Sequence, residues 1–405
     1  MHQAIQMSDT LWYLGSSDRR LAKFENCHPV PLGISYNSYL VMDEKTVLLD
    51  TVDHSICGVF LENIKSVLNG RPLDYIIVNH MEPDHCATLA EVLLRYPEAT
   101  VVGSAKTHAM IKQFFGDLNL QGKVMQVKEN DTLSTGHHNF RFILAPMVHW
   151  PESMVTFDTT TGVLFSNDSF GGYGAHEGGL FDDSKTRARW EGEMLRYYAT
   201  IVGRYSNVVQ VALKKLASLP ITNIFPAHGT LFREDVGQVI GLYDRWSRYE
   251  ADCGAVVVYG SMYGNTKRMA EAVCSGLSDS GVKDVHLYDA ARSGPSYILR
   301  DIWRYRGFAL LSCTYNTLLF PPMEALCSKL LNRMPKNRAL GIAGSYSWSR
   351  GALDALREFA KNIKLEVVGP EVEAFASPTA EDLGQCVELG KNLGRQAGGP
   401  CPLPS

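Results

Sequence analysis

The sequence NHMEPDH at residues 79–85 contains four side chains that can bind a metal: His80, Glu82, Asp84 and His85. A β-branched run precedes this segment and a stretch with helical periodicity follows it, so we expect a loop at the end of a strand. Alternate side chains of such a loop can converge on one centre while the others face a second centre. Burying four ionisable groups this close together without a cation would be costly. The segment therefore predicts metal binding, with His80 and Glu82 paired at one metal and Asp84 and His85 at another.

Three further candidate ligands follow apolar, strand-like runs, namely His149 in MVHWP, Asp168 in FSND and His228 in FPAHG. Strand ends are where sheet enzymes gather their sites, so these positions suit ligands. Taken alone, each has an ordinary structural explanation, as a hydrogen-bonded histidine or as a turn aspartate. Two other histidines, His137 and His138, lie in a Gly-flanked turn, where we expect them to be exposed.

A second group of polar residues occupies the segment GSMYGNT at 260–266. It follows the apolar strand expected at 255–259 and precedes a helix expected from Lys267 onward. A small, hydroxyl-rich loop at a helix N-terminus predicts a phosphate site, because free N–H groups, the helix dipole and hydroxyls all face the anion. Neither GxxxxGK nor GxGxxG is present, which argues against a nucleoside triphosphate or a dinucleotide. The candidate residues are Ser261, Met262, Tyr263, Gly264, Asn265 and Thr266.

Two later strand ends continue this pattern, with CTYNT at 313–317 and GSYSWS at 344–349. Both place small residues and an aromatic at the carboxyl edge of a parallel sheet, where ligands bind in doubly wound folds. Either aromatic alone is more simply a packing residue, but with the first loop and in this order the region resembles flavodoxin. We therefore predict bound FMN, contacted also by Thr314, Tyr315, Asn316, Thr317, Gly344, Ser345, Tyr346, Ser347 and Trp348.

The pattern of elements changes near residue 250, where we place a domain boundary. Residues 1–250 predict a layered sheet-and-helix domain. Residues 251–405 predict a βαβαβ arrangement around buried parallel strands. The tail at 396–405 is rich in Gly and Pro and is expected to be disordered. In the first domain the strands are expected at 39–42, 46–50, 73–78, 124–127, 140–144, 154–158 and 163–166, and helices at 87–94, 193–202, 208–219 and 242–250. In the second domain the strands are expected at 255–259, 308–312 and 340–343.

Composition narrows the class of protein further. The chain has 405 residues, of which 45% are hydrophobic and 20% charged, which suits two globular domains. A net charge of −4 gives no reason to expect a nucleic acid partner. No apolar run approaches the ~18 residues that would span a membrane, and the N-terminus lacks the pattern of a secretory signal. Nine cysteines without a CxxC pair indicate reduced thiols. We therefore expect a cytoplasmic protein with no membrane partner.

The metal motif resembles that of a known superfamily. HxExDH followed by a distant His, Asp and His is similar to the metallo-β-lactamase superfamily, whose hydrolases usually carry HxHxDH and bind zinc. With Glu82 in the second position, the motif looks like that of flavodiiron proteins. A carboxylate in place of an imidazole hardens the ligand set, which favours iron over zinc. Because the flavodoxin-like half follows in the family's order, the resemblance covers nearly the whole chain in a minimal two-domain form. It implies an αββα metallo-β-lactamase-like domain followed by a flavodoxin-like, doubly wound parallel sheet.

The resemblance also implies how the ligands are shared between two irons. One iron would take His80, Glu82 and His149, and the other Asp84 and His228. Asp168 would bridge them, at a metal–metal distance of ~3.5–4 Å. His85 is a further candidate for the second iron, since the matching residue is not a ligand in every member.

An activity follows from the same resemblance. The enzyme would reduce O2 to water, couple two NO to N2O and water, or do both, with electrons passing from a rubredoxin-like carrier through FMN to the irons. The sequence leaves the preference between O2 and NO open. An alternative is a zinc-dependent hydrolase fused to a flavodoxin module, against which Glu82 argues. A non-catalytic electron-transfer or sensor protein would leave the full ligand set unexplained.

The size of the two domains bears on assembly. Compact domains of this length have centres roughly 40 Å apart, which would separate the two cofactors of one chain too widely for fast electron transfer. Family members adopt an arrangement in which FMN of one chain serves the irons of the other. We therefore expect a head-to-tail homodimer or a dimer of such dimers.

One departure from the family concerns an early loop. Many members carry a histidine near the irons there, and a loose alignment puts Glu25 in its place. Tyr197 and Tyr198 lie on a predicted helix and could bring a phenol near the site, although helix core is the simpler interpretation.

Overall fold

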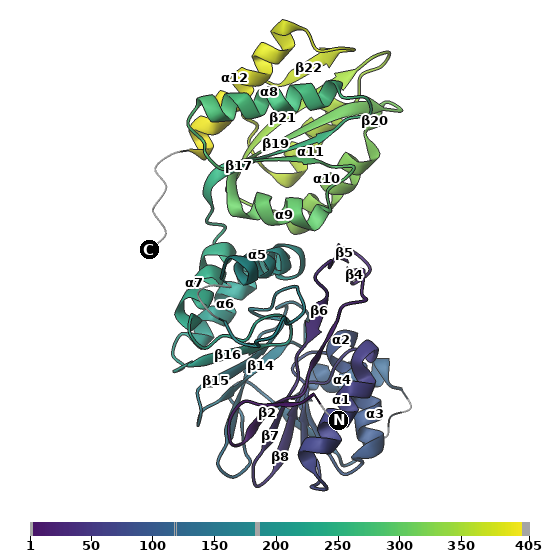
Figure 1. Ribbon diagram of the computed structural model, residues 1–405, viewed down its shortest axis with the longest axis vertical. Coiled ribbons are helices and arrows are strands. Elements are labelled where there is room, and N and C mark those ends of the chain that lie inside the picture. The colour runs from purple at the N-terminus through teal and green to yellow at the C-terminus, as the bar shows by residue number, and fades with distance from the viewer. Residues whose placement is uncertain (1–2, 117, 119, 183–186, 399–405) are drawn as a thin grey trace. The chain divides into compact units, whose positions relative to one another are not determined.

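The computed structural model describes residues 3–398 except 117, 119 and 183–186, and it divides into two compact units. The first unit is Met1–Asp244 and the second is Arg245–Ser405 (Figure 1). Among the described residues, no helix is both long and apolar enough to cross a membrane.

The first unit contains two main β-sheets. The order of the first sheet is β1 (Ile5–Gln6), β2 (Leu11–Tyr13), β7 (Tyr39–Met42), β8 (Thr46–Leu49), β9 (Tyr75–Ile77), β10 (Thr100–Ser104) and β11 (Val124–Val127). The order of the second is β12 (Thr132–Ser134), β13 (Asn139–Leu144), β14 (Met154–Asp158), β15 (Val163–Asn167) and β16 (Asn223–Pro226). Two small antiparallel sheets are formed by β3 (Ser16–Asp18) with β6 (Ile34–Tyr36) and, within the segment that joins these strands, by the hairpin of β4 (Lys23–Phe24) and β5 (His28–Pro29).

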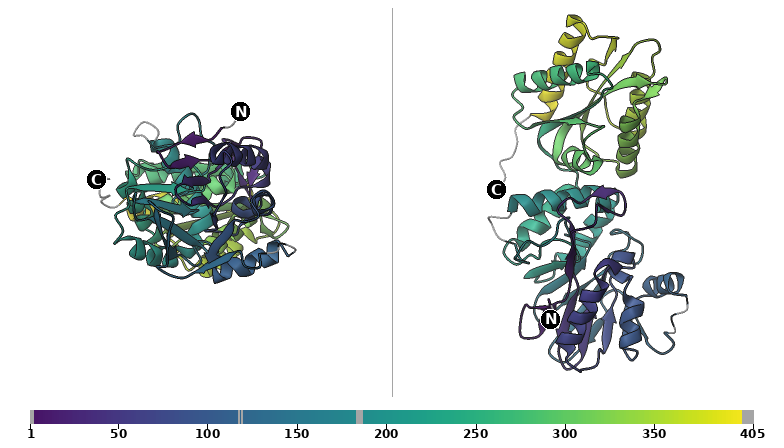
Figure 2. Two further views of the ribbon diagram at one scale, coloured as in Figure 1. Left: turned by 90° about the horizontal axis from the view of Figure 1, so that it is seen from below. Right: turned by 45° about the vertical axis from the view of Figure 1, so that its right-hand side comes forward.

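The core of this unit lies between its two sheets. Val41 and Val47 of the first sheet and Phe140 and Phe165 of the second belong to one buried apolar cluster. Helices form the outer layers, as Figures 1 and 2 show. They are α1 (Cys57–Leu68), α2 (Pro83–Cys86), α3 (Leu89–Arg95) and α4 (Ala105–Phe114) beside the first sheet, and α5 (Arg187–Tyr197), α6 (Ser206–Leu216) and α7 (Val236–Ser247) beside the second.

The second unit is a parallel sheet in the order β18 (Val285–Asp289), β17 (Asp252–Gly260), β19 (Tyr305–Tyr315), β21 (Ala339–Tyr346) and β22 (Val372–Phe375). This is the 2-1-3-4-5 order of doubly wound flavodoxin-like sheets. The short strand β20 (Leu318–Leu319) pairs antiparallel with β19. One face carries α8 (Asn265–Asp279) and α12 (Ala380–Ala397). The other carries α9 (Pro295–Arg304), α10 (Pro321–Arg333) and α11 (Ala352–Ile363).

Strand β17 shows why the strands of this sheet have unbroken apolar sequences. Ala255 and Val257 pack in the cluster with α8 and α12, whereas Val256 and Val258 pack in the cluster with α9, α10 and α11. Both faces of the strand are therefore buried, as in other parallel sheets.

Several expected elements differ in detail from the structure. The predicted metal loop ends in a single helical turn, α2, for which Pro83 suits the first turn. The predicted helix at 193–202 is α-helical only to Tyr197, and Tyr198–Val202 form a π-helix. Strand β19 continues through the expected loop to Tyr315, because it pairs with β20 in a hairpin. In the expected disordered tail, α12 extends to Ala397, and residues 399–405 lie outside the described residues.

The prediction for His138 was wrong. Its side chain is only 2% exposed, whereas His137 is exposed as expected. The imidazole lies with Nδ1 2.7 Å from Asp158 Oδ2 and Nε2 2.8 Å from Thr10 Oγ1. A local Gly-flanked pattern cannot show that the turn folds back onto a buried carboxylate from another strand.

Candidate metal centre

The seven predicted ligands meet in two adjoining groups in the first unit. His80, Glu82, His149 and Asp168 form one group, and Asp84, His85 and His228 form the other. Within each group the potential ligand atoms lie within 4.8 Å of one another. The residues come from the ends of four strands and from α2, so the fold gathers side chains that are up to 148 positions apart, from His80 to His228.

Asp168 lies between the two groups and faces both. Its Oδ2 is 3.2 Å from Nε2 of His80 and 3.2 Å from Nε2 of His149. Its Oδ1 is 2.9 Å from Nε2 of His85 and 3.6 Å from Nε2 of His228. One carboxylate oxygen for each group is the geometry that a bridging ligand requires.

The ligand atoms themselves carry few hydrogen bonds. Both oxygens of Asp168, Oδ1 of Asp84 and Nε2 of His85 and His149 are buried without a hydrogen-bond partner. Buried polar atoms are rarely left in this state without a compensating interaction. A pair of cations coordinated by these atoms would satisfy them, so the residues fit two metals.

Other residues hold the ligands in place. Nδ1 of His80 lies 2.7 Å from Oε1 of Glu152, which also accepts a 2.8 Å hydrogen bond from the backbone N–H of Met81. Nδ1 of His228 lies 2.7 Å from the carbonyl oxygen of Ser35. Both histidines thus turn Nε2 toward the centre, which is how outer partners orient metal-binding imidazoles. A lone glutamate in the sequence gives no signal of this role, so Glu152 was not predicted.

Asp50 connects the two loops that carry the predicted ligands His80 and Asp168. Its Oδ1 accepts a 2.6 Å hydrogen bond from the backbone N–H of Asn79, and its Oδ2 accepts from the amides of Asn79 and Asn167 at 2.9 and 3.1 Å. Each asparagine directly precedes a predicted ligand. Burial raises the pKa of the Asp50 carboxyl. Asp50 also escaped prediction, because its partners lie 29 and 117 positions away.

The charges of the centre depend on one another. Burial alone would lower the pKa of His80, but the neighbouring carboxylates of Asp168, Glu152 and Glu82 outweigh it and raise the pKa well above its usual range. Burial likewise opposes ionisation of Asp168, yet the surrounding histidines hold its pKa well below the usual range. The carboxylates therefore stabilise positive charge at this position, which metal cations would supply.

The β4–β5 hairpin covers the centre. The ring of Phe24 lies 5.3 Å from that of His228. Oε2 of Glu25 lies 3.7 Å from Nε2 of His28, and burial, followed by the charge of the nearby Glu82, raises the pKa of Glu25 to about 8. Of the two tyrosines considered, Tyr197 is buried with its ring 5.6 Å from that of His228, whereas Tyr198 bonds to Ser206 at 2.9 Å in the core.

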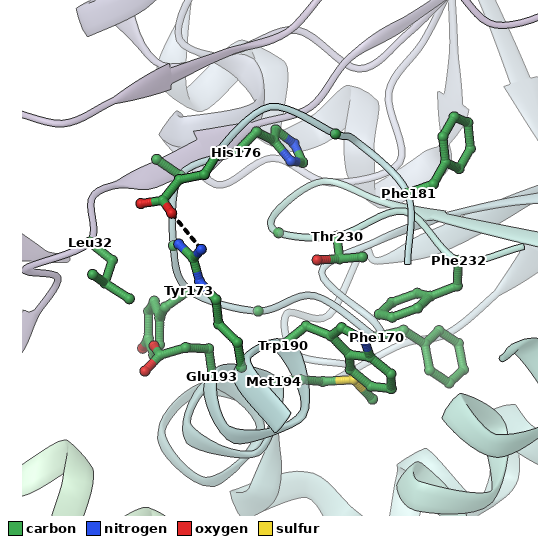
Figure 3. Close-up of a pocket in the computed structure, with 17 residues that line it drawn as sticks. Leu32, Phe170, Tyr173, His176, Phe181, Trp190, Glu193, Met194, Thr230 and Phe232 are labelled. Carbon is green, nitrogen blue, oxygen red and sulfur yellow. Dashed lines mark hydrogen bonds and ion pairs between the residues drawn. The ribbon is translucent and has the colours of Figure 1, made fainter. Parts of the chain in front are cut away.

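A separate cavity of about 260 Å³ adjoins the segments that follow two of the ligands. Its lining includes Tyr173, downstream of Asp168, and Gly229, next to His228. Figure 3 shows Trp190, Met194 and several aromatic rings around it. Two of its lining residues, Glu177 and Arg189, form an ion pair at 2.5 Å. The predicted ligands are not among its lining residues.

The predicted FMN loops lie together at one edge of the second unit's sheet. Gly260, Ser312 and Gly344 are register partners on neighbouring strands, so the segments that follow them share this edge. Thr266 Oγ1 lies 3.0 Å from Ser345 Oγ, which links the first loop to the third.

The start of α8 suits an anion. Its N-cap is Gly264, with φ +100° and no side-chain cap, so the first N–H groups of the helix lack a side-chain acceptor. The Ser261 hydroxyl oxygen accepts a 2.9 Å hydrogen bond from the Gly264 N–H, which fixes the loop. Uncapped N–H groups at a helix N-terminus fit a phosphate.

Aromatic side chains surround the same edge. Tyr263, Trp348 and Tyr315 are 95%, 77% and 41% exposed. Large exposed aromatic side chains at the edge of a sheet where ligands bind can pack against the planar ring of a ligand. The residues of this edge thus fit both the phosphate and the planar ring of FMN.

Comparison with known proteins agrees with this geometry. The family model described as ODP family beta lactamase matches residues 34–229, and the flavodoxin family model matches residues 257–390. These matches confirm the predicted fold class. A nitric oxide reductase from Moorella thermoacetica is 31% identical over 97% of this chain and 98% of its own length. Two solved structures have a TM-score of 0.93. They are rubredoxin oxygen:oxidoreductase from Desulfovibrio gigas, 28% identical over 97% of this chain and 98% of that one, and the flavodiiron protein from Giardia intestinalis, 27% identical over 98% and 97%.

Proposed function

The chain belongs to the flavodiiron protein family, and from this premise we propose which of its residues build the two cofactor sites. It is an oxidoreductase that reduces NO or O2 at a non-haem di-iron centre and carries FMN. The predicted enzyme class and cofactors are thereby confirmed, and the hydrolase alternative is not favoured.

One iron would be held by His80, Glu82 and His149, and the other by Asp84, His85 and His228, with Asp168 available to both. The single observation that carries this assignment is the orientation of Asp168, one oxygen toward each group. His85 is included because its buried Nε2 lacks a hydrogen-bond partner and belongs to the second group.

FMN is held by the three loops at the sheet edge. Ser261–Thr266 and the N-terminus of α8 take the phosphate, and residues 314–317 and 344–348 lie along the ring. We place the two domains at residues 1–250 and 251–405. The ends of the compact units at Asp244 and Arg245, and the family-model matches ending at 229 and beginning at 257, support this division.

When bound, the irons and FMN supply the redox chemistry, which takes four electrons and four protons per O2, or two of each per pair of NO. The protein's residues supply ligation and shielding. Glu152 and the Ser35 carbonyl orient two imidazoles. Phe24, Tyr36 and Tyr197 place their rings within 5.3 to 5.6 Å of the His228 ring, which keeps water from this side of the centre.

The electron donor is a rubredoxin-type carrier, in line with the name of the Desulfovibrio relative. The working form is a head-to-tail homodimer, or a dimer of such dimers, in which FMN of one chain serves the irons of the other. The enzyme acts in the cytoplasm, where thiols such as those of the buried Cys86, Cys327 and Cys386 stay reduced.

Anaerobic purification with quantitation of iron, zinc and flavin tests this proposal. We expect about two irons and one FMN per chain, and turnover of O2, NO or both with reduced rubredoxin. Two zincs and no iron, in protein made with ample iron, would contradict it. Parallel assays with O2 and NO then establish which substrate is preferred.

A further inference from the structure

An apolar cavity of about 20 Å³ lies between α6 and the second sheet of the first unit. This volume exceeds the roughly 10–15 Å³ that one water-sized molecule needs. Among the described residues that line the cavity, only Ser169 and Tyr243 have a polar group in the side chain. Cavities with such walls stay dry and take up apolar ligands, xenon among them. The cavity is therefore suited to a small molecule without charge.

The lining of this cavity includes residues next to two predicted metal ligands. Val148 directly precedes His149, and Ser169 directly follows Asp168. Another part of the lining is Ala212 of α6, which is half-buried and so lies near solvent. The cavity therefore extends from the flank of α6 to two loops that carry candidate ligands.

Phe170 lines this cavity and also the larger cavity of about 260 Å³. Its ring is 4.4 Å from the ring of Tyr243, another lining residue of the smaller cavity. The backbone of Phe170 has a φ of +67°, in the left-handed region, where a bulky residue is a strained outlier. Such strain clusters at active sites and ligand-binding sites, where the surrounding structure enforces it. The strained residue here is shared by both cavities and lies two positions after Asp168.

The segment that leads into α6 is irregular as well. Tyr198–Val202 form a π-helix, and π-helical turns occur frequently at functional sites. The ring of Tyr198 lies 4.9 Å from that of Tyr243 in the cavity wall. Its hydroxyl bonds at 2.9 Å to Ser206, the first residue of α6. The π-helix thus supports both the start of α6 and one ring of the cavity.

We propose that this cavity binds the uncharged diatomic substrate, O2 or NO, beside the loops that carry His149 and Asp168. The inference rests on the proposed function. Both gases are small, uncharged and weakly polar, so they leave water readily for an apolar site. The same walls exclude ions, because desolvation of a charge is costly. The cavity thereby concentrates substrate next to the metal centre.

Two variants of the full chain change the cavity in opposite directions. Ala212→Leu adds bulk to its lining, and Leu213→Ala enlarges it. Ala217→Leu makes the first change at the exposed C-cap of α6, outside the cavity lining, and is the matched control. Melting temperatures of the three variants establish that each of them folds.

Xenon is the probe for the cavity, because it binds dry apolar cavities and takes no part in turnover. In crystals of the holoenzyme under xenon pressure, we expect a xenon atom in contact with Phe170 and Val155, which both line the cavity. Its occupancy should fall several-fold in Ala212→Leu and rise in Leu213→Ala. Ala217→Leu should keep the wild-type occupancy.

Turnover is then measured against the concentration of O2 and, separately, of NO. We expect Ala212→Leu to raise KM by roughly 10-fold for the gas that occupies the cavity, as a surplus methylene does in an apolar pocket. The kcat at saturating gas should stay within a few-fold of the wild type, because no ligand is changed. Ala217→Leu should match the wild type in both constants. The two assays distinguish O2 from NO as the occupant.

A wild-type cavity without xenon would overturn the inference, as would a wild-type KM for both gases in folded Ala212→Leu protein. Equal rises in KM in Ala212→Leu and Ala217→Leu would also overturn it. If Ala212→Leu does not fold, unchanged xenon occupancy in Leu213→Ala has the same meaning. If the holoenzyme reduces neither gas, the proposed function fails instead, and xenon occupancy still tests the cavity as an apolar binding site. The two failures are therefore distinguishable.

Discussion

At the scale of single residues, the proposed ligand Glu82 would set the chemical character of the metal centre. It would supply a hard oxygen in place of the nitrogen of an HxHxDH motif, and its neighbours His80 and His149 lie 3.4 and 3.0 Å away. Burial would raise the pKa of Glu82, but these two imidazoles outweigh burial and hold the pKa well below its usual range. The ligand is therefore a carboxylate at neutral pH.

Glu82→His should shift metal preference from iron toward zinc, because it restores three imidazoles around one metal. Iron content and turnover should fall, whereas FMN content should not change, since its loops lie in the other unit. Metal analysis after growth with equal iron and zinc measures this. Glu98→His, at an exposed glutamate, is the control. A Glu82→His protein with full iron and full activity would show that ligand hardness is not decisive here.

His176 makes stability depend on pH. Burial, and to a lesser degree the charge of Arg19, lower the pKa of this imidazole to about 4. The unfolded chain binds the proton near pH 6.5, so the contribution of His176 is fully present above that pH. It is lost as the pH falls from about 6.5 to 4.

His176→Gln should therefore reduce the loss of stability over this interval by roughly 2 kcal/mol. Urea unfolding of the metal-depleted protein at pH 7 and pH 4.5 measures the difference. His137→Gln, at an exposed histidine, should follow the wild type. Parallel pH profiles for the wild type and His176→Gln would rule out this linkage.

Residue type and spacing predicted which side chains gather into the two groups, because four candidate ligand side chains within six positions are hard to explain without metal. The residues behind them were not predictable in this way. Glu152 and Asp50 are single carboxylates whose partners come from distant strands. Their roles arise only when the two sheets pack together.

At the scale of elements, the loop between β17 and α8 should control flavin retention. Ser261→Ala with Thr266→Ala removes two hydroxyls, each worth roughly 1.5–3 kcal/mol if bonded to phosphate. The double variant should lose FMN on dialysis and keep its iron. Ser275→Ala, on the exposed side of α8, is the control. Flavin held at wild-type affinity by the double variant would place the phosphate site elsewhere.

Burial decided which elements could be predicted. Strands β17, β19 and β21 are covered on both faces and read as apolar runs. Edge strand β18 is half-exposed, and its sequence VHLYD carries no clear pattern. The hairpin β4–β5 has two residues per strand, too few for any periodicity to show. Its importance lies in what its tip touches, which is a tertiary contact.

At the scale of the whole molecule, each unit has a core of its own. The cluster between the two sheets belongs to the first unit, and the clusters on the two faces of the parallel sheet belong to the second. A change in one cofactor site should therefore leave the other site folded. This independence allows a test of the proposed cross-chain route.

One chain carries His80→Ala and Asp168→Ala and keeps FMN, and the other carries Ser261→Ala and Thr266→Ala and keeps iron. Equal mixing with subunit exchange gives mixed dimers in half the population, each with one intact FMN–iron pair. A head-to-tail dimer should then regain about a quarter of wild-type activity. Each variant alone should be inactive. Mixed dimers without activity, or a fully active wild-type monomer, would show that electrons pass within one chain.

The separate cores also have a consequence for how the protein is made. At about 5–20 residues per second, a ribosome needs roughly 10–30 s to synthesise Arg245–Ser405 after the first unit has emerged. That interval is long compared with the folding of a single domain. The nascent first unit can thus close around its ligand set and recruit iron before any flavin pocket exists. Iron supply during translation, and flavin supply after release, would limit the yield of active enzyme.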